Sequence, residues 1–214
     1  MERAGAGASR SPPDRLPRRM SSRLRQLPLA LLALIAVLAL GACGDSHTKV
    51  TTGTYAGESG ANAPYLDIGP LKYEVQLSRQ LNPANSEDSG YLVGLTPAQR
   101  QLLPGQEWFG VFIQVYNETD TPLLSAHELT ISDTQSNVYR PIVPDLTNPY
   151  AYRATIVPPK ERLPIADSTQ AFGPTQGALL LFKIQTVSLD NRPLEFRIFD
   201  PLNPVLYSSA ELDV

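Results

Sequence analysis

Proline is the residue that most limits what this chain can fold into. The sequence has 20 prolines in 214 residues, and 16 of them lie in residues 43–214. That density is close to twice the usual share of about 5%. Proline interrupts helices and central strands because it lacks a backbone N–H and clashes with the preceding helical turn. We therefore expect short elements joined by turns.

The hydrophobic pattern after residue 63 predicts strands rather than helices. Residues 71–77 alternate strictly between apolar and polar side chains, which is the period of a half-buried strand. Residues 107–116 are largely apolar at both odd and even positions, which favours a central strand covered on both sides, or one that crosses from open to covered. Further extended segments are predicted at residues 128–132, 138–140, 178–184, 194–200 and near 205–207.

The segments between these strands carry turn residues. Residues 82–90 are predicted as a loop and residues 133–137 as a polar turn, whereas residues 96–103 form a candidate short helix with Thr96 as cap and Pro97 at its first position. About seven or eight short strands with almost no helical pattern favour an all-β fold, a β-sandwich of antiparallel strands. A closed barrel is the alternative.

The first 42 residues have the three-part layout of a signal peptide. Arg23 and Arg25 precede an apolar run at residues 27–40, and small residues follow it. The run is short for a membrane span, which needs about 20 residues. We therefore predict a signal peptide over residues 1–42. Met20 opens a second, complete leader, so translation from Met20 is an alternative start.

The end of this leader carries the only cysteine of the chain. Residues 40–43, Leu-Gly-Ala-Cys, resemble the lipobox of bacterial lipoproteins. The resemblance implies that the Cys43 sulfur receives a diacylglyceryl group and that Cys43 becomes the first residue of the mature protein. The lipid would hold the chain on the extracytoplasmic face of the cell membrane. With its thiol used as a thioether, the mature chain has none left for a disulfide or a metal site.

The mature chain is predicted to have a tether and one domain. Residues 43–62 are rich in Gly, Ser and Thr and lack periodicity, which is typical of a flexible tether, and residues 63–214 are enough for one β-sandwich domain. Residues 43–214 contain 11 Lys and Arg against 19 Asp and Glu, a net charge of about −8. This acidic balance argues against nucleic acid as a partner and against electrostatic adhesion to anionic lipids.

A second resemblance concerns the domain itself. Residues 109–123 read Phe-Gly-Val-Phe-Ile-Gln-Val-Tyr-Asn-Glu-Thr-Asp-Thr-Pro-Leu, and Glu-Leu-Thr-Ile-Ser-Asp and Asn-Val-Tyr follow at residues 128–133 and 137–139. This pattern is similar to an immunoglobulin-like domain of unknown function that is common in bacterial lipoproteins, especially of Gram-positive lineages. The resemblance covers residues 66–205, with an insertion at 78–104. It implies an immunoglobulin-like sandwich in the cell envelope and supplies no catalytic residues.

The chain offers few residues for chemistry. Its only histidines are His47 and His127, so a His/Cys metal cluster is excluded by count, and we expect no metal and no cofactor. We interpret His127 as a hydrogen-bonded residue at a strand end, and residues 133–137 as a turn rather than a calcium loop. No nucleophile, base and orienting group can be assembled, so we expect no enzymatic activity.

One segment has the composition of a contact surface. Tyr150, Tyr152 and Arg153 lie in a proline-rich stretch, and Tyr and Arg are enriched at interface hot spots. We predict that these three residues bind a partner. The alternative is a loop whose tyrosines cover the open end of the sandwich.

Together these features predict a lipid-anchored, extracytoplasmic binding or scaffold module without catalytic activity. Its expected partners are the membrane, through the lipid on Cys43, and an envelope protein. The alternative function is a small-ligand sensor or carrier subunit of an envelope transport system.

Overall fold

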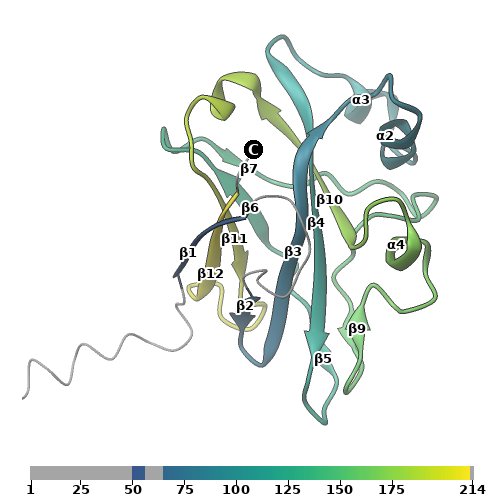
Figure 1. The fold of residues 1–214 in the computed structure, drawn as a ribbon, viewed down its shortest axis with the longest axis vertical. Helices are drawn as coiled ribbons and strands as arrows, with labels where there is room; N and C mark the ends of the chain where they lie inside the picture. The colour runs from purple at the N-terminus through teal and green to yellow at the C-terminus, as the bar shows by residue number, and fades with distance from the viewer. Residues whose placement is uncertain (1–49, 56–64, 213–214) are drawn as a thin grey trace, which may run out of the picture. The chain divides into compact units, whose positions relative to one another are not determined.

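The computed structural model describes residues 50–55 and 65–212 (Figure 1). The predicted signal peptide, Met20, Cys43 and most of the predicted tether lie outside these residues, and the predictions made for them stay predictions. Within the described residues, no helix is long and apolar enough to cross a membrane.

One antiparallel sheet is built around a long central strand, β4. The sheet has the order β10-β4-β3-β2, and the short β9 pairs with the last part of β4. Its strands are β2 (Tyr65–Ile68), β3 (Leu71–Leu81), β4 (Gln106–Asn117), β9 (Arg162–Leu163) and β10 (Ala178–Gln185). Figure 1 shows β3 and β4 side by side along their length. Residues 107–116 are thus a central strand, as predicted.

The second sheet has the order β1-β12-β11-β6-β7. Its strands are β1 (Val50–Tyr55), β6 (Leu129–Ser132), β7 (Val138–Tyr139), β11 (Leu194–Phe199) and β12 (Tyr207–Leu212). All neighbours are antiparallel except β1, which runs parallel to β12. The two short strands β5 (Leu123–Leu124) and β8 (Ile156–Val157) form a separate pair.

The strand order is that of an immunoglobulin-like sandwich. β3, β4 and β10 lie in one sheet, and β6, β7, β11 and β12 lie in the other. The chain therefore crosses between two sheets that enclose one core, as in a β-sandwich. The predicted all-β, immunoglobulin-like fold is confirmed.

The β3–β4 sheet buries apolar side chains on both faces. The larger cluster lies between the sheets and includes Tyr73, Val75 and Ile113; the smaller one lies on the outer face and includes Trp108 and Phe112. A bulge at Gln76 in β3 connects the two, because Val75 pairs with Ile113 whereas Leu77 pairs with Phe112. The extra residue turns Leu77 toward the outer cluster. The predicted strand over residues 71–77 is thus confirmed as part of β3, but its side chains stop alternating between the two faces after Val75.

Short helical turns lie in the connections. They are α2 (Ser86–Tyr91), α3 (Pro97–Arg100), α4 (Thr169–Phe172) and the 3₁₀ turn η2 (Thr186–Leu189). The short helix capped by Thr96 is confirmed, with a full capping box to Gln99.

The loop predicted at residues 82–90 is wrong in part, since α2 begins within it. The Asn85 side chain caps α2 by accepting from Glu87 N at 2.8 Å. Asp88 then ties α2 to β3 through an ion pair of 2.6 Å with Arg79. This helix of six residues is stable because the Asn85 cap holds its first turn and the ion pair with Arg79 holds one face.

Two strands lie where the sequence predicted something else. Residues 50–55 were predicted as part of the tether, but they form β1. The final strand runs from residue 207 to 212, not near 205–207. Ser208 and Ser209 made this segment look polar, yet both are buried, and the Ser208 hydroxyl donates to Asp67 O at 2.6 Å.

Candidate functional site

The structure places the three candidate binding residues in different environments. Tyr152 is only 6% exposed and belongs to the core between the sheets. Tyr150 and Arg153 are half-buried. The Tyr152 side chain is therefore largely covered by the sandwich, as in the alternative interpretation, although Tyr152 also lines a pocket. That the three residues bind a partner stays a prediction.

The hydroxyl groups of Tyr152 and Tyr73 both form hydrogen bonds with the backbone of Ala126. The Tyr152 hydroxyl donates to Ala126 O at 2.7 Å, and the Tyr73 hydroxyl accepts from Ala126 N at 2.7 Å. Burial raises the pKa of Tyr152 to about 12 and also raises the pKa of Tyr73. Both hydroxyls therefore stay protonated and serve as structural hydrogen-bonding groups.

Tyr150 covers the outer apolar cluster. Its ring meets the Tyr91 ring edge to face, with the centroids 4.9 Å apart. Asn148 sets this geometry, since its Oδ1 accepts from Tyr150 N and its Nδ2 donates to Tyr91 O. No local pattern in the sequence indicates this role of Asn148, which is an ordinary turn residue before Pro149.

Arg153 holds the chain that follows β7. Its guanidinium donates to Pro144 O at 3.0 Å and to Asp145 O. Within the part of the chain that the structure describes, two of its five N–H donors are used in this way, which leaves others for a bound group.

Next to Arg153 and Tyr152 is a pocket of about 300 Å³. It opens at the edge of β10, where residues 141–144 and 152–154 meet the start of β6. Ile142 N and Tyr152 N donate to Leu181 O and Leu179 O, which fixes both segments against β10. Apolar side chains dominate the lining: Leu129, Pro141, Ile142, Val143, Pro144, Ala154, Leu179 and Leu180, together with Tyr152, His127 and Arg153.

His127 is exposed at this pocket. It lies two residues before β6 begins, so it is close to the predicted strand end, but no hydrogen bond from its side chain is seen among the described residues. The hydrogen-bonded role of His127 therefore stays a prediction. With Arg153 it forms the polar part of an otherwise apolar lining.

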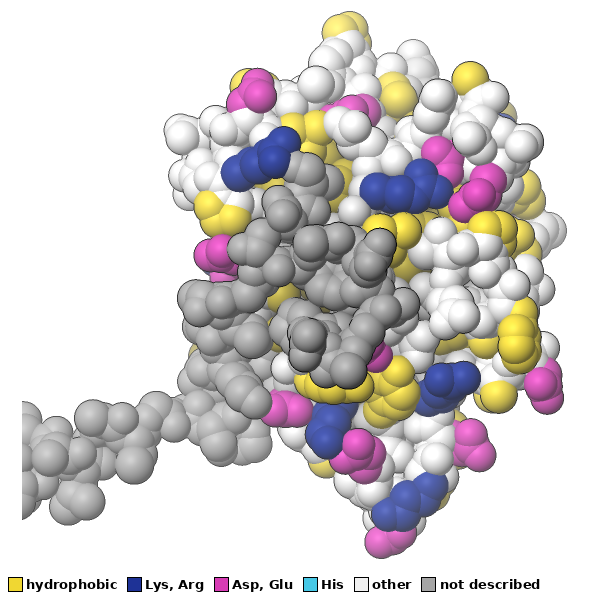
Figure 2. Space-filling model, viewed as in Figure 1, with side chains coloured by type: hydrophobic (Ala, Val, Ile, Leu, Met, Phe, Trp, Pro, Cys, Tyr) yellow, Lys and Arg dark blue, Asp and Glu magenta, His cyan; other side chains and the backbone are white. Residues whose placement is uncertain are grey.

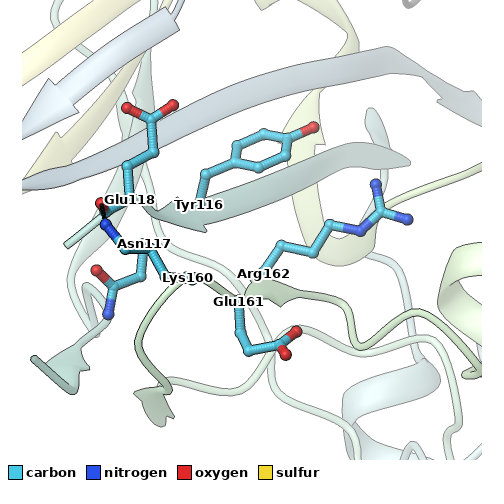
Figure 3. Close-up of a pocket in the computed structure, with 6 residues that line it drawn as sticks. All are labelled: Tyr116, Asn117, Glu118, Lys160, Glu161 and Arg162. Atoms are coloured by element: carbon cyan, nitrogen blue, oxygen red, sulfur yellow. Dashed lines mark hydrogen bonds between the residues drawn. The ribbon is translucent and has the colours of Figure 1, made fainter. Parts of the chain in front are cut away.

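A second pocket, of about 360 Å³, lies where β4 ends and β9 begins (Figure 3). Its lining is polar: Tyr116, Asn117, Glu118, Lys160, Glu161 and Arg162. In Figure 3 the side chains of Glu118 and Glu161 point in opposite directions. Lys160 donates to Glu118 O at 2.8 Å and pairs with Asp120 at 3.1 Å, and Glu118 pairs with Lys72. Lys160 and Glu118 of this pocket thus already have partners.

The polar turn at residues 133–137 is confirmed. The buried Asp133 carboxylate accepts hydrogen bonds from Gln135 N, Asn137 N, Asn137 Nδ2 and the Ser188 hydroxyl, all at 2.7–2.9 Å. Burial alone would raise the pKa of Asp133, but the hydrogen bonds from Asn137 and Ser188 outweigh it and lower the pKa to about 2. The Asp133 oxygens are thus used by hydrogen bonds within the turn and from Ser188. Among the described residues no group of three or more potential metal ligands is found.

Comparisons with known proteins add a limited result. No protein-family model and no curated protein matches the sequence. Among solved structures, the yjhA protein from Bacillus subtilis is similar over 73% of this chain and 99% of its own, with 10% identity and a TM-score of 0.45. An uncharacterised β-sandwich protein from Clostridium difficile is similar over 75% and 97%, with 11% identity and a TM-score of 0.39. Both TM-scores lie below 0.5, so the fold assignment rests on this chain's own strand order.

Proposed function

We propose that this chain is a lipid-anchored, extracytoplasmic binding module without catalytic activity, related to the immunoglobulin-like domains of bacterial lipoproteins. The lipid on Cys43 would hold it at the cell membrane, and the pocket beside Arg153 would bind an envelope protein. The observation that carries the binding role is this pocket, a concave apolar surface with a few polar groups at one side, as ligand sites generally have.

The pocket lining defines the chemistry of the partner. Arg153 and His127 are its only side chains that can carry a positive charge, and none of its lining residues is acidic. A partner would therefore insert an apolar side chain and place a carboxylate or carbonyl against the free N–H groups of Arg153. This pattern of an apolar anchor beside an Arg is common at interface hot spots.

The surface charges are compatible with a protein partner. On the face shown in Figure 2, basic and acidic side chains lie close to one another, with apolar side chains between them. Such mixed charge does not form the basic stripe that binds nucleic acid.

The pocket can be tested by filling it. Ala154 is exposed and lines the pocket, so Ala154→Phe places a ring in the cavity without entering the core. Ala166 is also exposed and does not line the pocket, which makes Ala166→Phe the matched control. Chemical cross-linking in intact cells should recover an envelope protein with the wild type and with Ala166→Phe, but not with Ala154→Phe. Equal recovery with all three would show that the pocket is not the binding site.

A small-ligand carrier is the second candidate, and the pocket size is the observation that favours it. Its volume of about 300 Å³ lies at the lower end of the range for small-molecule sites, roughly 300–1,000 Å³. Native mass spectrometry of the protein released from membranes distinguishes the two. A small molecule that copurifies with the wild type and is lost in Ala154→Phe would favour the carrier over the protein-binding module.

A further inference from the structure

The connection between β11 and β12 is an apolar loop that the proposed binding site does not use. Residues 201–207 read Pro-Leu-Asn-Pro-Val-Leu-Tyr, and no charged residue occurs between Asp200 and Glu211. Leu202 is 88% exposed and Val205 is 81% exposed, so both are almost fully open to solvent. Single exposed apolar residues are ordinary, but two at the tip of one uncharged loop form a surface suited to an apolar partner.

This loop is held in a defined shape. The Asp200 carboxylate accepts from Leu202 N at 2.7 Å and from Asn203 N at 3.2 Å, and Asp200 N donates to Leu206 O at 2.9 Å. Two prolines further restrict the backbone. The loop therefore presents Leu202 and Val205 outward, and little conformational entropy is lost when they enter a new environment.

The loop lies at the end of the sandwich where the chain from Cys43 enters. β1 runs parallel to β12, and Val50 pairs with Ser209, two residues after β12 begins (Figure 1). Only six residues separate Cys43 from Val50. At no more than about 3.6 Å per residue, the start of β1 lies within roughly 25 Å of the lipidated residue. The end of the domain that carries the loop must therefore stay near the membrane.

We infer that the loop at residues 200–206 contacts the lipid bilayer, with Leu202 and Val205 inserted among the head groups. This inference rests on the proposed lipid anchor at Cys43. The acidic balance of residues 43–214 gives no electrostatic attraction to anionic lipids, so the contact is apolar. A short tether keeps the loop at high effective concentration near the bilayer, so that even a weak insertion is populated.

The residues flanking the loop suit the membrane–water interface. The Phe199 and Tyr207 rings pack together with their centroids 5.6 Å apart, and the Arg197 guanidinium lies 5.2 Å from the Tyr207 ring centre. Aromatic rings and arginine are enriched at the head-group level, where one end of the side chain is apolar and the other is hydrated. The bilayer contact therefore fixes which end of the sandwich faces the membrane, which a lipid alone does not do.

A fluorescent probe at the loop tests the contact in the full-length, lipid-modified protein. Because the lipid occupies the only native thiol, Leu202→Cys provides one reactive site for a polarity-sensitive dye. Leu146→Cys is the matched control, because Leu146 is 86% exposed but does not belong to this loop. The neighbouring Asp145 N donates to Gly94 O, so this turn lies beside the end of α2. The variants are placed in phosphatidylcholine vesicles whose acyl chains carry a spin-label quencher. The dye at residue 202 should shift to shorter wavelength and be quenched severalfold more than the dye at residue 146.

The outcomes separate the loop contact from the anchor. The mass of the N-terminal peptide reports whether Cys43 carries lipid, and Val205→Cys gives a second, independent position on the loop. A lipidated protein in which probes at residues 202, 205 and 146 are quenched equally would overturn the loop contact and leave the anchor intact. An unmodified Cys43 thiol in membrane fractions would overturn both.

Discussion

Removing the hydroxyl of Tyr152 should destabilise the domain, although this tyrosine was first predicted as a surface residue. In the structure this hydroxyl donates a hydrogen bond of 2.7 Å to Ala126 O inside the core. Tyr152→Phe keeps the ring and leaves that carbonyl without its donor. A buried carbonyl that loses its hydrogen-bond donor lowers the free energy of unfolding by about 1–3 kcal/mol, because it stays removed from water without a partner.

This cost translates into a measurable shift. In a domain of 150–250 residues each kcal/mol changes Tm by roughly 2–4 °C, so Tyr152→Phe should melt about 2–12 °C below the wild type. Tyr152→Ala also opens a cavity and should cost about 3–5 kcal/mol or more. Trp108 is the only tryptophan and is buried, so its fluorescence reports the unfolding of the core directly.

Tyr150→Phe is the matched control, because it removes the same group two residues away. Among the described residues no hydrogen bond from the Tyr150 hydroxyl is seen, and the ring contact with Tyr91 survives the change. Its Tm should stay within about 1–2 °C of the wild type, corresponding to 0.5 kcal/mol or less. If Tyr152→Phe melts with the wild type, or if both variants fall equally, the hydrogen bonds to Ala126 do not stabilise the core as reasoned here.

Three further predictions follow from the anchor, the core and the polar turn. Cys43→Ser should leave an unlipidated precursor, seen by mass spectrometry and by the loss of fatty-acid labelling. Ile113→Asp places a charge at a fully buried position of β4. Such a substitution should lower the free energy of unfolding by more than about 4 kcal/mol, and circular dichroism should show an unfolded chain. Asp133 has a lowered pKa, so its stabilisation is complete above pH ~4 and disappears as the pH falls through about 2. Urea unfolding between these pH values should show a steeper loss of stability in the wild type than in Asp133→Asn.

The fold was predictable because most of its longer strands are defined by local patterns. The apolar residues of β4, β10 and β11 and the turns between them were found from the sequence with errors of one or two residues. The edge strand β1 was not, because its pairing depends on a neighbour far away in the sequence. β1 is rich in Thr and Gly like a linker and becomes a strand only by pairing with β12, whose own serines are buried by contacts far apart in sequence.

The candidate site was predictable only in part, for the same reason. Composition marked the segment of Tyr150, Tyr152 and Arg153 as unusual, but it could not show which side chains point inward. That direction depends on hydrogen bonds to Ala126, Pro144 and Leu179, which lie 9 to 27 residues away in the chain. The pocket itself combines four separate segments, and no local pattern in any one of them indicates a cavity.

The fold is compatible with both the proposed anchor and the proposed binding site. In the second sheet β1 and β6 are three strands apart, which at about 4.8 Å per step separates them by roughly 14 Å. The proposed tether thus enters at one edge of this sheet, whereas the pocket lies toward the other, where β6 begins. Leu129 of the pocket pairs with Ile198 of β11, close to the loop that we infer touches the bilayer. An anchored domain would therefore keep its pocket open and near the membrane, within reach of a partner that is itself a membrane protein.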